Sequence, residues 1–184
     1  MDKTIAKEFD DFVKRQKPSP TAERPVDWNK ERNDWIAYLN SLYDQIESFL
    51  KPYKDSIRIE CPDIQLDEEY IGRYTVKQMI LHIGRQEITL TPIGTLLIGF
   101  KGRVDVVGSA GKAILALVNK DAVDARSLIR VKVTVGTKKS PQPEEEMKKN
   151  IEWVWKIAGP PPLIRFIDLN EESFLQLIMD VSNA

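Results

Sequence analysis

The sequence contains one cysteine, Cys61, and one histidine, His82, among its 184 residues. A single cysteine excludes an intrachain disulfide and a zinc site built from several cysteines. A single histidine excludes metal sites that use two or more histidine ligands from this chain. No apolar run approaches the roughly 20 residues that a membrane-spanning helix needs, and the N-terminal residues lack the apolar segment of a signal peptide. We therefore expect a cytoplasmic protein that does not bind membranes.

The sequence also lacks a complete phosphate-binding loop. The segment GSAGKA at 108–113 resembles the P-loop pattern, which requires an earlier glycine and a hydroxyl residue after the lysine. Val106 stands in place of that glycine, and Ala113 stands in place of the metal-binding hydroxyl. We interpret GSAG as a turn between two strands, and we expect no nucleotide or other cofactor.

No set of catalytic residues is complete in the sequence. His82 has no nucleophile or orienting acid near it in the chain, so we expect a structural or surface histidine. The remaining carboxylates suggest a nuclease-like Asp…Glu-x-Lys set, but they lie on scattered segments, and surface exposure is the simpler interpretation. These acids and the accompanying lysine are Asp63, Glu87, Asp105, Glu146 and Lys148. The sequence therefore predicts neither catalytic residues nor a metal site.

The charges are present in nearly equal numbers but are unevenly distributed. Residues 1–72 hold 11 Lys or Arg and 16 Asp or Glu, residues 73–139 hold 12 and 4, and residues 140–184 hold 4 and 8. Either the acidic flanks neutralise the basic centre within the fold, or part of the basic centre faces an acidic partner. The candidate partner-binding residues are Arg103, Arg130, Lys132, Lys138 and Lys139.

Residues 73–118 alternate apolar runs with glycines, which predicts the centre of an antiparallel meander. We expect a first strand at 56–61, an acidic turn at 62–70 and a second strand over about 72–83. Tight turns are expected at Gly84-Arg85, at Lys101-Gly102 and at GSAG. Later strands are expected at 128–135, around NIEWVWKI and at LIRFID. Apolar and polar residues alternate so regularly over 128–135 that one face of the sheet should contact water.

Helices are expected on both sides of this sheet in the sequence. Residues 4–16 have helical apolar spacing, and the proline-rich segment 17–25 separates them from the rest of the chain. Residues 28–50 carry a wide apolar stripe after the N-cap candidate Asp27, which is typical of a helix lying on a sheet. Asn170 is the expected cap of a closing helix that begins with two glutamates.

Trp153 and Trp155 lie two residues apart and therefore share one face of a strand. They are candidates for stacking on bases or for lining a cavity, while packing in the core is the alternative interpretation.

We predict an α+β fold with an antiparallel meander of about seven or eight strands, strongly curved in one variant. Two N-terminal helices and one C-terminal helix would pack on it, with residues 1–25 as a separable segment and 26–184 as one domain. The leading hypothesis for function is a non-enzymatic binding domain that acts through a protein partner, in an accessory, immunity or antitoxin-like role. The alternatives are nucleic-acid binding by the basic sheet face and a small-molecule cavity between sheet and helix.

Overall fold

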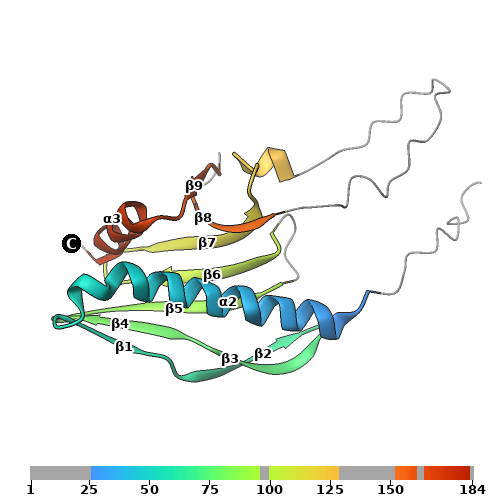
Figure 1. The fold of residues 1–184 in the computed structure, drawn as a ribbon, viewed down its shortest axis with the longest axis horizontal. Helices are drawn as coiled ribbons and strands as arrows, with labels where there is room; N and C mark the ends of the chain where they lie inside the picture. The colour runs from blue at the N-terminus through green and yellow to red at the C-terminus, as the bar shows by residue number, and fades with distance from the viewer. Residues whose placement is uncertain (1–25, 96–99, 129–151, 161–163, 183–184) are drawn as a thin grey trace, which may run out of the picture.

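The computed structural model describes residues 26–95, 100–128, 152–160 and 164–182, and it has an α+β fold (Figure 1). One antiparallel sheet forms a layer, and helices α2 (Trp28–Leu50) and α3 (Glu171–Ser182) pack on the same face of it. The predicted α+β class and antiparallel sheet are therefore confirmed. The helix predicted at 4–16 and most of the strand predicted at 128–135 lie outside the described residues, and strong curvature of the sheet stays a prediction.

Within the described residues the main sheet has seven strands, and every neighbouring pair is antiparallel. Strand β1 forms one edge and β9 forms the other. In spatial order the strands are β1 (Ile57–Glu60), β4 (Met79–Ile83), β5 (Gln86–Gly94), β6 (Gly102–Val107), β7 (Lys112–Asn119), β8 (Trp153–Ala158) and β9 (Phe166–Asp168). A separate two-stranded sheet contains β2 (Asp63–Glu68) and β3 (Gly72–Lys77).

The two sheets are joined in one long bent hairpin, which corrects two predictions. Residues 62–70 were expected to form a turn, but 63–68 form β2 because Ile64 and Leu66 alternate with polar residues and pack against the core. The strand expected over 72–83 is divided into β3 and β4 at Gln78. The N–H of Gln78 donates to the carbonyl oxygen of Pro62 at 2.9 Å, so the ladder keeps its register through the bend.

The turn predicted at Lys101-Gly102 is wrong. Gly102 is the first residue of β6 and pairs with Leu117, and the N–H of Lys101 donates to the carbonyl oxygen of Leu117 at 2.8 Å. A Cβ atom on Gly102 would lie 2.2 Å from Cζ3 of Trp35, so this glycine allows α2 to approach the sheet closely. The turn at Gly84-Arg85 is confirmed by the pairing of Ile83 with Gln86 and by the positive φ of 58° at Gly84.

Helix α2 begins and ends where the sequence predicts. The Asp27 side chain caps its first turn by accepting a hydrogen bond from the N–H of Lys30 at 3.0 Å. Its apolar stripe is buried on the sheet, with the exposed fraction of each of these side chains at 5% or below. The buried residues are Trp35, Leu39, Leu42, Tyr43, Ile46 and Leu50.

Helix α3 is held at both ends. The Asn170 side chain accepts a hydrogen bond from the N–H of Ser173 at 2.9 Å, which confirms the predicted cap. At the other end the GSAG segment forms the predicted β6–β7 turn and also contacts the helix. The N–H of Ala110 donates to the carbonyl oxygen of Val181 at 2.8 Å, and Ser109 Oγ donates to that of Ser182 at 3.1 Å. The turn thus satisfies carbonyl groups that a helix C-terminus leaves without partners. In the part of the chain that the structure describes, no helix is long and apolar enough to span a membrane.

Candidate functional site

A groove of about 890 Å³ runs between α3 and the ends of strands β6–β9. The chain enters α3 directly from β9, so the helix lies beside the strands that form the opposite wall (Figure 1). The α3 wall contains Glu172, Ser173, Gln176, Leu177, Asp180 and Val181. The sheet wall includes Arg103, Asp105, Lys112, Ala113, Ile114, Ile157 and Ile167.

The floor of this α3 groove is apolar. Ile157, Leu177 and Val181 belong to the main core cluster, and only their edges reach the groove. Ile167 differs because 53% of this residue is exposed, and it lies on the edge strand β9 next to the buried Phe166. An exposed isoleucine over an apolar floor provides a surface that a partner or ligand can cover.

Charged side chains of both signs line the α3 groove. Glu172, Gln176 and Asp180 recur every four residues and therefore form one stripe of α3. Gln176 Nε2 donates to Asp180 Oδ1 at 2.7 Å, which holds the end of this stripe together. On the strands, Lys112 is exposed and Arg103 binds the carboxylate of Asp105 through two nitrogens. The strand register places these three residues on the sheet face opposite the helices.

Arg103 is the only predicted partner-binding residue that lies in a described segment. It lines the α3 groove, but its guanidinium is half-buried and already paired with Asp105 at 2.5 and 3.0 Å. Its charge is therefore largely compensated within the chain. The other candidates, Arg130, Lys132, Lys138 and Lys139, lie outside the described residues.

The two tryptophans proposed for a cavity lie away from the α3 groove. Trp155 is buried, its Nε1 donates to the carbonyl oxygen of Tyr38 at 3.0 Å, and its ring lies 5.9 Å from that of Trp35. Trp153 is half-buried beneath the ammonium group of Lys101, which lies 5.5 Å from the ring centre. This placement favours the core-packing interpretation, and a role in ligand binding stays a prediction.

The described candidates for acid–base chemistry lie at three separate places on the two sheets. His82 lies on the sheet face opposite the helices, with its ring nitrogens 3.6 Å from a Glu60 oxygen and 3.7 Å from a Glu87 oxygen. Asp63 pairs with Lys77 at 3.1 Å on the bent hairpin, and Asp105 pairs with Arg103. Among the described residues, no group of three or more His, Cys, Asp or Glu side chains is placed to hold a metal ion. Glu146 and Lys148 lie outside those residues.

Two buried tyrosines fix the bent hairpin. The Tyr43 hydroxyl donates to the carbonyl oxygen of Lys77 at 2.8 Å, and the Tyr74 hydroxyl donates to the carboxylate of Glu68. Burial raises the pKa of both tyrosines well above the ordinary value, and the hydrogen bond to Glu68 raises the pKa of Tyr74 further. Glu68 also accepts from the N–H and hydroxyl of Thr95 at 2.8 and 2.9 Å, which ties the hairpin tip to the end of β5.

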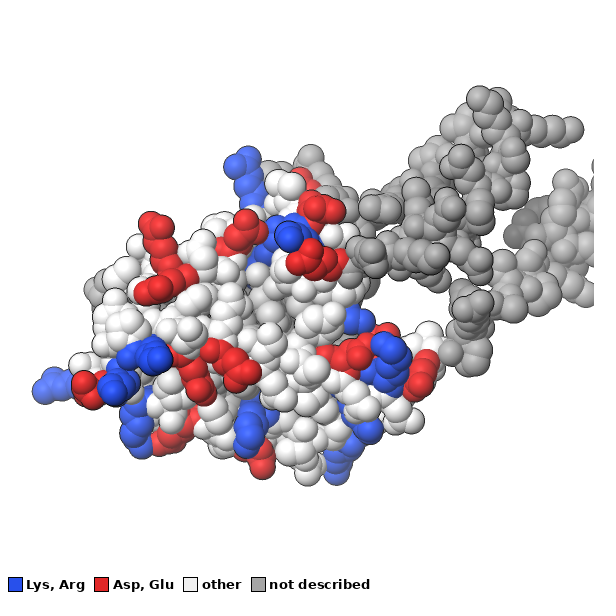
Figure 2. Space-filling model, viewed as in Figure 1, with Lys and Arg blue, Asp and Glu red and all other residues white. Residues whose placement is uncertain are grey.

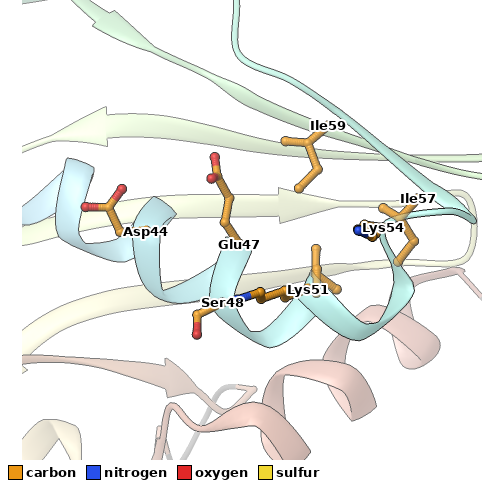
Figure 3. Close-up of a pocket in the computed structure, with 8 residues that line it drawn as sticks. Asp44, Glu47, Ser48, Lys51, Lys54, Ile57 and Ile59 are labelled. Atoms are coloured by element: carbon orange, nitrogen blue, oxygen red, sulfur yellow. The ribbon is translucent and has the colours of Figure 1, made fainter.

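A second groove, of about 500 Å³, lies between the C-terminal half of α2 and strand β1 (Figure 3). Ile57 and Ile59 face it from the strand. Its charges are separated along its length, with Asp44 and Glu47 toward one end and Lys51 and Lys54 toward the other. Sequence reasoning identified the strand and the helix but did not place them at an edge of the sheet.

Acidic and basic side chains are interspersed over the face that carries α2, and neither sign forms a continuous area among its described residues (Figure 2). This distribution supports the interpretation that charges are largely compensated within the fold. No protein-family model matches the chain, and comparisons with curated proteins and with solved structures find no match.

Proposed function

We propose that this protein acts by binding rather than by catalysis, and that it holds a segment of a protein partner in the α3 groove. The observation that carries the proposal is the half-exposed Ile167 beside an apolar floor and an acidic stripe on α3. Apolar anchors surrounded by polar rims are the usual anatomy of protein interfaces. An accessory, immunity or antitoxin-like role is compatible with such a module.

The chemistry of the groove specifies the partner segment. Apolar side chains would cover Ile167 and Leu177, and basic side chains would face Glu172 and Asp180. An amphipathic segment with Lys or Arg beside its apolar anchors meets both requirements.

The experiment begins with peptides selected from a random library on the immobilised full chain. We expect the selected sequences to combine apolar and basic residues, and we expect Ile167→Glu to weaken their binding by about tenfold or more, the loss typical of a buried anchor. Met179→Glu is the control, because Met179 is 50% exposed on α3, the helix that forms one wall, but does not line the groove. Calorimetric titration of the two variants should separate them. Equal affinities would contradict the proposal.

A small molecule is the second candidate occupant, because the groove volume of about 890 Å³ falls within the usual range of ligand sites. A thermal-shift screen with small metabolites tests it. Stabilisation by a metabolite that is lost in Ile167→Glu and kept in Met179→Glu would favour this candidate over the peptide.

Nucleic-acid binding by the basic sheet remains the other alternative, although the pairing of Arg103 with Asp105 does not favour it. A salt titration with duplex DNA tests it, since each phosphate contact contributes a slope of about 0.9 on a log–log plot. We expect weak binding that disappears at physiological salt. Nanomolar affinity that Arg130→Glu/Lys132→Glu abolishes would favour nucleic acid over a protein partner.

A further inference from the structure

Strand β1 has one hydrogen-bonded neighbour, β4, and no other strand of the described residues pairs with its outer edge. The bond from Gln78 N–H to the Pro62 carbonyl marks that pair as a hydrogen-bonded position of the ladder. Hydrogen-bonded and non-hydrogen-bonded pairs alternate along antiparallel strands, so Arg58 and Glu60 turn their backbone groups toward β4. Ile57 and Ile59 therefore turn theirs toward the outer edge, where another strand can pair.

The side chains of β1 are self-complementary. Arg58 and Glu60 flank Ile59 on the sheet face away from the helices. Suppose that a second copy of β1 pairs antiparallel about a two-fold axis at Ile59. Arg58 then lies directly opposite Glu60 of the partner subunit, and Glu60 lies directly opposite Arg58 of the partner subunit. Both pairs occupy non-hydrogen-bonded positions, where cross-strand side chains are closest and opposite charges stabilise the pairing.

The groove above β1 has the same symmetry property. Its acidic end carries Asp44 and Glu47, and its basic end carries Lys51 and Lys54, with Ile59 nearer the middle and Ile57 beside Lys54 (Figure 3). A two-fold rotation about Ile59 brings the basic end of one copy opposite the acidic end of the other. The strand and the helix thus favour the same partner in the same orientation.

We propose that the chain forms a two-fold symmetric homodimer in which β1 of two copies pair antiparallel and join two seven-stranded sheets into one. The charge pattern favours a second copy over an unrelated strand. The same rotation places opposite charges together both on β1 and in the groove beside α2. Pairing also removes the exposed edge, which proteins otherwise protect against uncontrolled association. The surface lies at the opposite edge of the sheet from β9 and the α3 groove, so it does not depend on the proposed function.

Charge reversal tests the dimer directly. Arg58→Glu alone places two acidic residues opposite each other, and Glu60→Arg alone places two basic residues opposite each other. We expect either variant to weaken self-association of the full chain about tenfold to a hundredfold, because like charges opposite each other destabilise strand pairing. Sedimentation velocity across the micromolar range measures the dissociation constant.

Self-association of an equimolar mixture of the two variants is the decisive measurement. In the mixed dimer every position 58 faces an opposite charge at position 60, so we expect the mixture to recover the wild-type dimer. The loss of the Arg58–Glu60 contact within one chain cannot explain such recovery. Arg73→Glu and Asp67→Arg reverse a comparable exposed pair on β2 and β3, and both should remain dimeric.

The proposal is overturned by a wild-type chain that stays monomeric throughout this range, by dimers that tolerate both reversals, or by a mixture that stays monomeric. A monomer that instead binds an unrelated extended peptide along β1 would also overturn it, since the edge would then serve a different partner.

Discussion

At the scale of single residues, Gly102 determines how closely α2 approaches the sheet. A methyl group there would meet the ring of the buried Trp35 at 2.2 Å. We expect Gly102→Ala to lower the free energy of unfolding by about 1–3 kcal/mol, the usual cost of overpacking a core. Urea denaturation measures the change. Gly111→Ala is the matched control, because a Cβ at Gly111 has nothing within 4 Å and should leave stability nearly unchanged.

The buried tyrosines make stability depend on alkaline pH. Burial raises the pKa of Tyr43 and Tyr74 in the folded chain, whereas an unfolded tyrosine ionises near pH 10. The contribution of these tyrosines to the free energy of unfolding is therefore complete below about pH 10. Above that pH the free energy of unfolding decreases by up to about 1.4 kcal/mol per pH unit for each tyrosine.

Urea denaturation between about pH 9 and 11 tests this dependence. Tyr43→Phe should make the free energy of unfolding fall less steeply with pH, while Tyr53→Phe, which replaces an exposed tyrosine, should keep the wild-type slope. The same slope in both variants would contradict the assignment.

At the scale of secondary structure, the GSAG turn fixes the end of α3. A Cβ on Gly108 would lie 2.4 Å from the carbonyl oxygen of Val181, which is backbone and cannot move aside alone. We expect Gly108→Ala to displace the last turn of α3 and to speed amide hydrogen exchange there by about tenfold or more, with α2 unaffected. Exchange that stays unchanged in α3 would show that the turn does not hold the helix.

Sequence patterns predicted the elements whose signals are local. The apolar stripe and Asp27 cap of α2, the Asn170 cap of α3 and the turn at Gly84-Arg85 each follow from residues a few positions apart. The hairpin tip was missed because Ile64 and Leu66 are embedded in an acidic segment that looks like a turn. Gly102 was wrongly assigned to a turn, because the sequence does not distinguish a glycine required by close packing from one required by a turn.

The candidate site was predictable only in part for the same reason. Arg103 was expected to bind a partner and does line the α3 groove, but its pairing with Asp105 depends on side-chain geometry. Ile167 and Leu177 were not identified, since nothing in their local sequence shows that β9 and α3 enclose a groove with β7. Nor did the sequence show that β1 is an edge strand, because strand order arises from long-range pairing.

At the scale of the whole molecule, one layer of sheet supports two separate surfaces. Both helices cover the same face, so the α3 groove forms where the shorter helix meets the β9 side of the sheet, and the β1 groove forms beside α2 at the other edge. A dimer through β1 would leave both α3 grooves open, so each copy could hold its own partner segment.

The most direct test of the account is amide hydrogen exchange on the full chain with and without a library-selected peptide. We predict that the peptide slows exchange in α3 and at the adjoining ends of β7, β8 and β9, and that Ile167→Glu removes this protection. Protection confined to β1, or confined to β4 and β5, would contradict the central claim that the α3 groove binds the partner.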